Sequence, residues 1–133
     1  MKSVPKPIKI KTKKKKLATF GSLLKEADRV FSIWIRTRDN YQCVICGSKE
    51  RPQNGHLIKR GKRAVRFDEK NCACQCASHN YSHNNYPEPY TNWFLNKYGA
   101  KEYGSLVERA HNNGKPYKFT REELNQIIER YKL

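Results

Sequence analysis

Four residues of metal-binding type form two closely spaced pairs in the middle of the chain. Cys43 and Cys46 have C-x-x-C spacing, and about thirty residues later Cys76 and His79 follow with C-x-x-H spacing. Thiolate and imidazole ligands in such pairs are typical of a structural zinc site with four protein ligands and no open position. We therefore expect these four residues to hold one structural Zn²⁺ ion.

Further polar residues lie between the two pairs and directly after them. His56 follows Gly55 in the intervening segment, Asn71 ends a polar loop, and Asn80 comes next to His79. Taken alone, each of these residues is typical of an ordinary surface position. A zinc ion that joins the two pairs would bring them close together, which is why we consider them a candidate catalytic set.

The net charge indicates a polyanionic partner. The sequence has 28 Lys and Arg residues against 12 Asp and Glu residues, which gives +16 at pH 7. Nucleic acid is the simplest partner for such an excess. An anionic membrane is the weaker alternative, because no apolar run approaches the roughly 18 residues of a spanning helix. The N-terminal lysines are also not followed by the apolar segment of a secretory signal.

Cysteine usage favours a reducing compartment. Five cysteines are an odd count, and the C-x-x-C spacing suits metal-bound thiolates better than a disulfide framework. We therefore expect a cytoplasmic protein. Cys72 and Cys74 are left out of the zinc set because free cysteines are more often simply buried. Cys72 nevertheless lies about one helical turn before Cys76 and could compete for the metal.

We divide the chain into a disordered basic arm over residues 1–20 and one domain over residues 21–133. Lysine dominates residues 1–16, which contain almost nothing able to pack. Such an arm would neutralise phosphates without reading sequence, and a solubilising tail is the alternative interpretation. A chain of 133 residues is small enough to benefit from a metal that stabilises its core.

Apolar periodicity predicts helices on both sides of the zinc pairs. Residues 22–38 carry the apolar stripe of an amphipathic helix, with Ser22 as its N-cap, and we interpret this helix as scaffold. Later helices are expected over residues 90–98 and 101–110, and after the capping box that begins at Thr120.

The segment between the zinc pairs is expected to form a hairpin. Residues 56–59 and 64–67 are the two strand candidates. A helix should begin within residues 72–76 and continue through His83. Four cations at the hairpin tip are suited to gripping a phosphate backbone, although a solvated turn is the alternative interpretation. These cations are Lys59, Arg60, Lys62 and Arg63.

Three stretches give the chain a family resemblance. They are Gly55-His56, Arg66-Phe67-Asp68-Glu69-Lys70-Asn71 and Gln75-Cys76-x-x-His79-Asn80. In this order and spacing they resemble the NinG/Rap recombination endonucleases of lambdoid phages, which belong to the HNH (ββα-metal) nuclease superfamily. The likeness covers nearly everything after residue 20. It implies an α+β fold in which a small zinc-stapled ββα-metal core has flanking helices at both ends.

The resemblance implies a role for each residue of the candidate catalytic set. His56 matches the general base, and a neutral histidine with a pKa near about 6.5 can accept the proton of a water molecule at pH 7. Asn71 matches the middle residue of the motif and is expected to bond the backbone across the loop, fixing His56. Asn80 matches a ligand of the catalytic divalent ion, Mg²⁺ or Mn²⁺.

Three positions depart from the family pattern. His79 replaces a fourth cysteine, which keeps the zinc site but weakens its hold on zinc at low pH. Gly55 stands where many HNH enzymes have an Asp that binds the catalytic metal, and His83 stands where a lysine is common. The remaining ligands of the catalytic ion are therefore left open among Asp68, Glu69 and His83. We also group His83 with the DNA-binding residues.

Two functions are compatible with the sequence. The first is a structure-selective DNA endonuclease that hydrolyses phosphodiesters in branched recombination intermediates such as Holliday junctions and D-loops, the substrate class that the resemblance implies. The second is a non-catalytic zinc-stapled protein that binds such intermediates. His56, Asn71 and Asn80 favour the first, because a pure binding protein does not need them.

The resemblance also implies a phage or prophage gene and action inside the bacterial host cell. Symmetric cutting of a four-way junction would favour a homodimer, but no heptad pattern or long apolar face indicates one.

Overall fold

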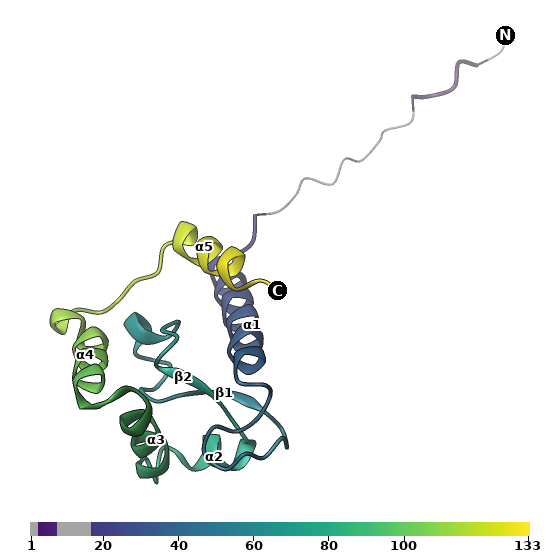
Figure 1. Cartoon of the computed structure of the whole chain (residues 1–133). Helices are drawn as coiled ribbons and strands as arrows, with labels where there is room; N and C mark the ends of the chain where they lie inside the picture. Colours follow the sequence, from purple (N-terminus) through teal and green to yellow (C-terminus); the bar gives the residue numbers. More distant parts are fainter. Residues whose placement is uncertain (1–2, 8–16) are drawn as a thin grey trace.

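The structure is a computed structural model that describes residues 3–7 and 17–133 (Figure 1). The basic arm expected over residues 1–20 therefore lies largely outside the described residues. The elements are α1 (Phe20–Arg38), β1 (Gln53–His56), η1 (Arg63–Val65), β2 (Cys72–Gln75), α2 (Ala77–Ser82), α3 (Glu88–Tyr98), α4 (Ala100–His111), η2 (Asn112–Gly114) and α5 (Arg121–Tyr131). They form a mixed α+β fold with one two-stranded sheet in the described part of the chain.

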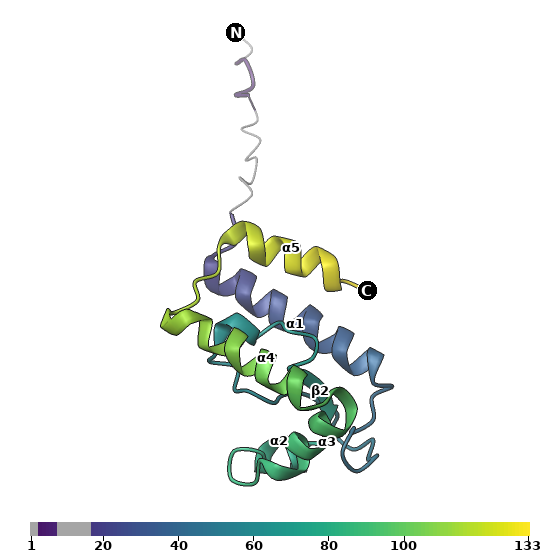
Figure 2. The ribbon, with the colours of Figure 1, turned by 60° about the vertical axis from the view of Figure 1, so that its left-hand side comes forward.

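The first and last helices, α1 and α5, lie side by side (Figures 1 and 2). Their apolar faces meet in contacts such as the edge-to-face packing of Phe31 on Tyr131, whose ring centroids are 4.8 Å apart. The predicted N-cap of α1 is wrong. Thr19 caps the helix, because its side-chain oxygen accepts the backbone N–H of Ser22 and α1 begins at Phe20.

The sheet pairs β1 with β2 in antiparallel register, so that Gln53 faces Gln75 and His56 faces Cys72. All four residues of β2 are buried, because helices cover both faces of the sheet. On one face Cys72 packs against apolar residues of α1. On the other face Ala73 packs in a core formed by residues of α3 and α4.

This burial explains why the strand prediction was wrong. A strand that is buried on both faces shows no alternation of apolar and polar residues, so β2 resembled the start of a helix. The helix begins only at Ala77, and the first strand is β1 rather than residues 56–59. The alternation over residues 64–67 has another cause. Val65 belongs to the core, while the neighbouring Arg66 is held in an ion pair.

The core beneath the sheet supports β1 directly. Tyr90, Phe94 and Leu106 are buried together with Ala73, and the Tyr90 hydroxyl donates a hydrogen bond of 2.9 Å to the carbonyl oxygen of Gly55. The predicted helices over 90–98, over 101–110 and after Thr120 are confirmed as α3, α4 and α5, with shifts of at most two residues. In the described part of the chain, no helix has the length and apolar character needed to cross a membrane.

Gly55 is required by close packing within the sheet. A Cβ atom at this position would lie 2.6 Å from Cδ of Gln75, closer than real Cβ contacts, and would meet the amide oxygen as well. Gln75 is fully buried, and its Oε1 and Nε2 have no hydrogen-bond partner in the described structure. The side chain of Gln75 thus fills the space that a side chain at position 55 would need.

We expect Gly55→Ala to lower the free energy of unfolding by about 1–3 kcal/mol, because the added methyl group overpacks a buried site. Denaturant unfolding at fixed zinc concentration measures this change. The matched background is Gln75→Ala, in which the obstructing amide is absent and Gly55→Ala should have a smaller effect. An equal loss of stability in both backgrounds would show that Gln75 is not the cause.

Candidate functional site

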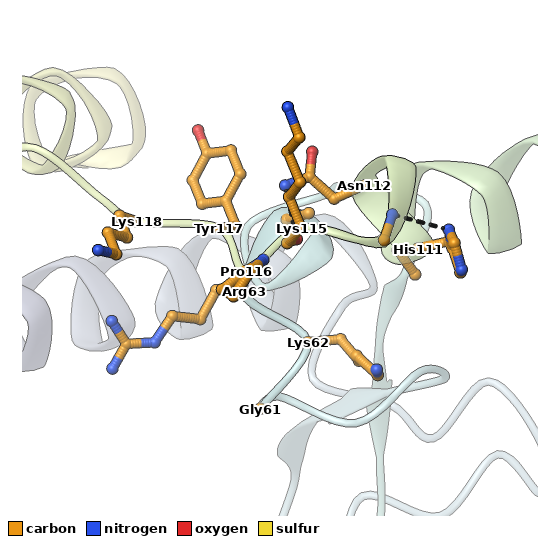
Figure 3. A pocket seen from close by; sticks show the side chains of 12 residues that line it. Gly61, Lys62, Arg63, His111, Asn112, Lys115, Pro116, Tyr117 and Lys118 are labelled. Atoms are coloured by element: carbon orange, nitrogen blue, oxygen red, sulfur yellow. Dashed lines mark hydrogen bonds between the residues drawn. The ribbon is translucent and has the colours of Figure 1, made fainter.

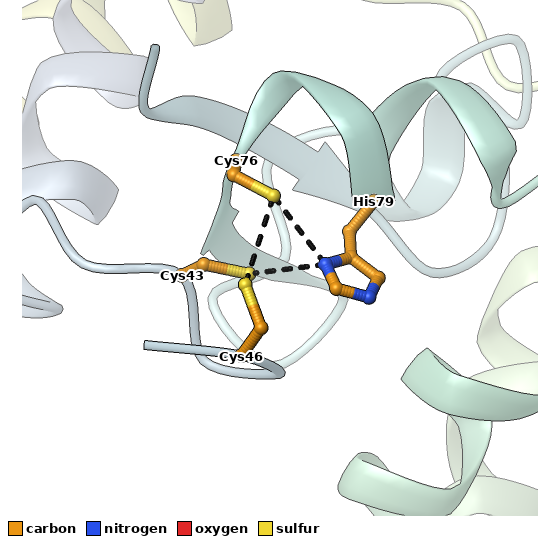
Figure 4. Close-up of side chains that lie close together, drawn as sticks. All are labelled: Cys43, Cys46, Cys76 and His79. Carbon is orange, nitrogen blue, oxygen red and sulfur yellow. Dashed lines mark hydrogen bonds between the residues drawn. The ribbon is translucent and has the colours of Figure 1, made fainter. Parts of the chain in front are cut away.

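Three cysteines and one histidine converge where the sequence predicted a zinc site (Figure 4). Cys43 and Cys46 lie on the loop after α1, Cys76 is the N-cap residue of α2, and His79 lies on that helix. Their four ligand atoms all lie within 4.8 Å of one another. In the described part of the chain this is the one such cluster, and Cys72 and Cys74 are not members of it.

The spacing of the ligand atoms fits a tetrahedral zinc ion. Zn–S bonds of about 2.3 Å and Zn–N bonds of about 2.0 Å imply S···S edges of about 3.8 Å and S···N edges of about 3.5 Å. The sulfur atoms of Cys46 and Cys76 are 3.8 Å apart, and Nδ1 of His79 lies 3.3 Å from the Cys76 sulfur and 3.8 Å from the Cys43 sulfur. The cluster could therefore hold Zn²⁺, as the sequence predicted.

The backbone prepares the cysteine loop for a metal. Gly47 has a φ of 77°, which favours glycine, and the N–H of Val44 donates to the carbonyl oxygen of Cys74, joining the loop to β2. Burial opposes ionisation of Cys43, but hydrogen bonds from the backbone N–H groups of Cys46, Cys76 and Ile45 outweigh it and lower the pKa of the thiol.

The two remaining cysteines are chemically different from the zinc ligands. Cys72 and Cys74 are buried in β2, and burial raises the pKa of both thiols, that of Cys74 to about 11. Both stay protonated at neutral pH, so they behave as small apolar residues.

We expect the wild type to bind one zinc ion tightly per chain. The Cys46→Ser variant should lose both this zinc ion and the cooperative unfolding transition. Removing one ligand leaves an incomplete metal site, and binding of a structural zinc contributes directly to folding. Elemental analysis and thermal unfolding measure both effects. Cys74→Ala is the matched control and should keep the zinc. A variant Cys46→Ser that keeps full zinc content and stability would contradict the assignment.

A groove of about 710 Å³ lies beside the zinc cluster and contains most of the predicted catalytic residues. His56 at the end of β1, Asn80 on α2 and His83 just after α2 all line it. Five cations line it as well, namely Lys25, Arg29, Arg36, Lys59 and Arg60. Asp28 is the one acidic residue among the described residues of the lining.

The ring of His56 is held by the backbone of Arg66. Its Nε2 lies 3.0 Å from the carbonyl oxygen of Arg66, and because a carbonyl oxygen only accepts, Nε2 carries the proton and Nδ1 holds the free lone pair. Burial is the main cause that lowers the pKa of His56 below 6.5, and the charges of Arg60 and Arg66 add to it. The ring is therefore neutral at pH 7.

The position of Arg66 is fixed from α1. Its guanidinium donates two hydrogen bonds to the carboxylate of Asp28, with an Nε to Oδ1 distance of 2.9 Å. Sequence analysis missed this pair, and it also interpreted the polar face of α1 as part of a scaffold. The signal was present in Lys25 and Arg29 beside Asp28 on that face, but nothing in the sequence alone shows that this face forms a groove wall.

Asn71 makes the backbone contacts expected from the sequence. It is fully buried. Its Oδ1 accepts the N–H of Ile58 at 2.8 Å, and its Nδ2 donates to the carbonyl oxygens of Ile58 and Val65, both at 3.0 Å. Asn71 thus joins the segment that leaves His56 to the segment that leads into Arg66. Both ends of the loop around His56 are held by this one side chain.

Two residues that line the groove each have a ligand-type atom without a protein partner in the described structure. Asn80 donates through Nδ2 to Oε1 of Gln53 at 2.8 Å, which leaves its Oδ1 free. His83 has its Nε2 2.8 Å from the carbonyl oxygen of Leu57, so its Nδ1 is the nitrogen with a lone pair. That Nδ1 is buried and has no hydrogen-bond partner.

The two acidic residues considered as metal ligands lie elsewhere. Asp68 pairs with Arg109 of α4, and Glu69 accepts a hydrogen bond of 2.8 Å from the hydroxyl of Tyr131 in α5. Neither side chain lines the groove. Of the three candidates left open by the sequence, the structure brings only His83 to the groove.

The cations of the predicted hairpin tip are divided. Lys59 and Arg60 line the groove that contains His56, whereas Lys62 and Arg63 line a different cavity, next to α4 and the segment after it. The predicted cluster is therefore not one surface.

One protein family matches almost the whole chain. The family model described as "Bacteriophage Lambda NinG protein" matches residues 5–133. Searches of curated proteins and of solved structures gave no match. Because the family model covers nearly the entire sequence, including the zinc cluster and the groove, the chain belongs to the NinG family of phage proteins.

Proposed function

We propose that this protein is a metal-dependent HNH endodeoxyribonuclease that acts on branched DNA, such as Holliday junctions and D-loops, in the cytoplasm of the bacterial host. One observation carries the proposal. His56, Asn80 and His83 line one cation-rich groove, and each has a ligand-type atom without a protein partner in the described structure. A binding protein would have no use for two oriented imidazoles in the same groove.

His56 would act as the general base. Its Nδ1 accepts a proton from a water molecule, the water oxygen bonds to phosphorus, and the bond from phosphorus to the 3′ oxygen breaks. The hydrogen bond from Nε2 to Arg66 orients the ring and stabilises the imidazolium that forms. Asp28 and Asn71 position the backbone that makes this bond. The 3′ oxygen leaves as a hydroxyl after it gains a proton, and His56 returns its own proton to solvent.

Asn80 and His83 would hold the catalytic cation. Oδ1 of Asn80 and Nδ1 of His83 are the two free ligand atoms described above, and the carbonyl that binds Nε2 of His83 is the kind of partner that orients metal-binding histidines. When bound, a divalent ion would neutralise the charge that develops on the phosphate and on the leaving oxygen. An imidazole ligand suits Mn²⁺ better than Mg²⁺, which prefers oxygen ligands.

The cations of the groove would bind the DNA backbone. Arg36 on α1 and Lys59 and Arg60 on the loop after β1 line the groove from two sides. Contacts of this kind position a phosphate backbone without reading base sequence. This fits an enzyme whose selectivity depends on DNA structure.

The proposal is tested by Mn²⁺- or Mg²⁺-dependent cleavage of labelled four-way, D-loop and linear DNA. We expect cutting of branched DNA, reduced at least about 100-fold in His56→Ala, the scale of a lost general base. Zinc content and DNA binding of the variant serve as controls and should be unchanged. Tight binding without cutting by the wild type under either ion would favour the non-catalytic alternative. Cutting that survives in His56→Ala would show that another group is the base.

The pH dependence of cleavage gives an independent test. Burial lowers the pKa of His56 below 6.5, so the neutral, proton-accepting form predominates above that pH. The cleavage rate should therefore rise with pH, pass its half-maximal value below pH 6.5 and be level at pH 7. Single-turnover cleavage rates at a fixed Mn²⁺ concentration measure this pH dependence, with zinc content checked at each pH. A midpoint above pH 6.5 would contradict a buried His56 as the base.

A further inference from the structure

A second cationic cavity lies beside the groove and is lined by two distant segments of the chain (Figure 3). It has a volume of about 660 Å³. Lys62 just before η1 and Arg63 at the start of η1 line one side, and Lys115 and Lys118 line the other from the connection between η2 and α5. The described residues that line this second cavity include no Asp or Glu, so nothing in its walls neutralises the four cations.

The walls of the second cavity are fixed by the fold. Val65 of η1 and Leu106 of α4 are buried in the same core cluster, which holds η1 beside α4. At the end of α4 the N–H of Gly114 donates to Nδ1 of His111 at 3.0 Å. Nδ2 of Asn112 donates to the carbonyl oxygen of Lys115 at 3.0 Å. The backbone that carries the cations on both sides is therefore held in place.

The four cations are free to bind an anion. Within the described residues, Lys62, Arg63, Lys115 and Lys118 take part in none of the ion pairs of this structure, whereas the nearby Arg109 is paired with Asp68. The C-terminal end of α4 adds a partial negative charge of about one half. Four formal positive charges outweigh it, so the second cavity attracts a polyanion.

The loop after β1 presents its cations to two different places. Lys59 and Arg60 face the groove of His56, and Lys62 and Arg63 face the second cavity. The Cα atoms of Lys59 and Arg63 are at most about 14 Å apart, the reach of four extended residues. The grooves that separate the two backbones of duplex DNA are about 6 and 12 Å wide, which is a distance of the same order.

We propose that the second cavity binds a second phosphodiester backbone of the substrate, while the groove binds the backbone that is cut. This inference rests on the proposed function. The second backbone is either the complementary strand of the same duplex or a strand from another arm of a branched DNA. Both offer the same phosphate chemistry to the second cavity.

The test uses the full-length protein with Lys115→Gln and Lys118→Gln combined. The matched control is Lys101→Gln combined with Lys132→Gln, which removes the same charge from exposed positions that line neither cavity. Equilibrium binding to a single strand, a linear duplex and a four-way junction is measured without divalent ions, between about 50 and 200 mM salt. Each lost phosphate contact should reduce the slope of log K against log salt by about 0.9, hence by about 1.8 for both.

We expect the slope to fall by this amount for DNA with two backbones. For the single strand, the slope should fall no more than it does in the control variant. A loss on both duplex and junction identifies the complementary strand, and a loss confined to the junction identifies a second arm. Either result supports the proposal. A loss no larger than that of the control, or an equal loss on the single strand, would overturn it. Failure of the wild type to cleave DNA would refute the nuclease without changing these slopes, so the two failures are distinguishable.

Discussion

The pairing of β1 with β2 is the interaction on which the rest of the candidate site depends. β1 ends at His56, and β2 leads directly into Cys76 and α2. The register of the pair therefore fixes the position of the imidazole relative to the helix that carries Asn80. The hydrogen bond between Gln53 and Asn80 crosses from the strand to the helix and depends on the same register. A shift by one residue would turn His56 to the opposite face of the sheet.

A sheet of two short strands is not stable alone, and the fold supports it in two ways. The Cys3His cluster could join the loop after α1 to the start of α2 through one zinc ion, which closes the open end of the sheet. Buried polar side chains support the other end. Asn71 spans the loop that follows β1, and Tyr90 bonds the strand from below. Buried hydrogen bonds of this kind are costly to break, because each leaves an unsatisfied partner.

The sequence predicted those parts of the site that depend on residue type and local spacing. The zinc ligands could be recognised because C-x-x-C and C-x-x-H pairs restrict the chemistry by themselves. The helices could be recognised from their apolar stripes. The strands could not, because β2 is buried on both faces and the alternation over 64–67 arises from a core valine beside the paired Arg66. The pairing of Asp28 with Arg66 was also out of reach, since it joins residues 38 positions apart that have no shared pattern.

The packing of α1 against α5 has a consequence for the order in which the protein acquires its site during translation. α1 supplies one wall of the groove and the carboxylate that fixes Arg66, yet much of its apolar surface is covered only by the last helix of the chain. Contacts between the two ends form late, because the intervening loop must close first. The residues of α5 must therefore leave the ribosome before α1 can settle and the groove can be completed. A nascent or truncated chain would carry every residue of the proposed catalytic set without the support that arranges it.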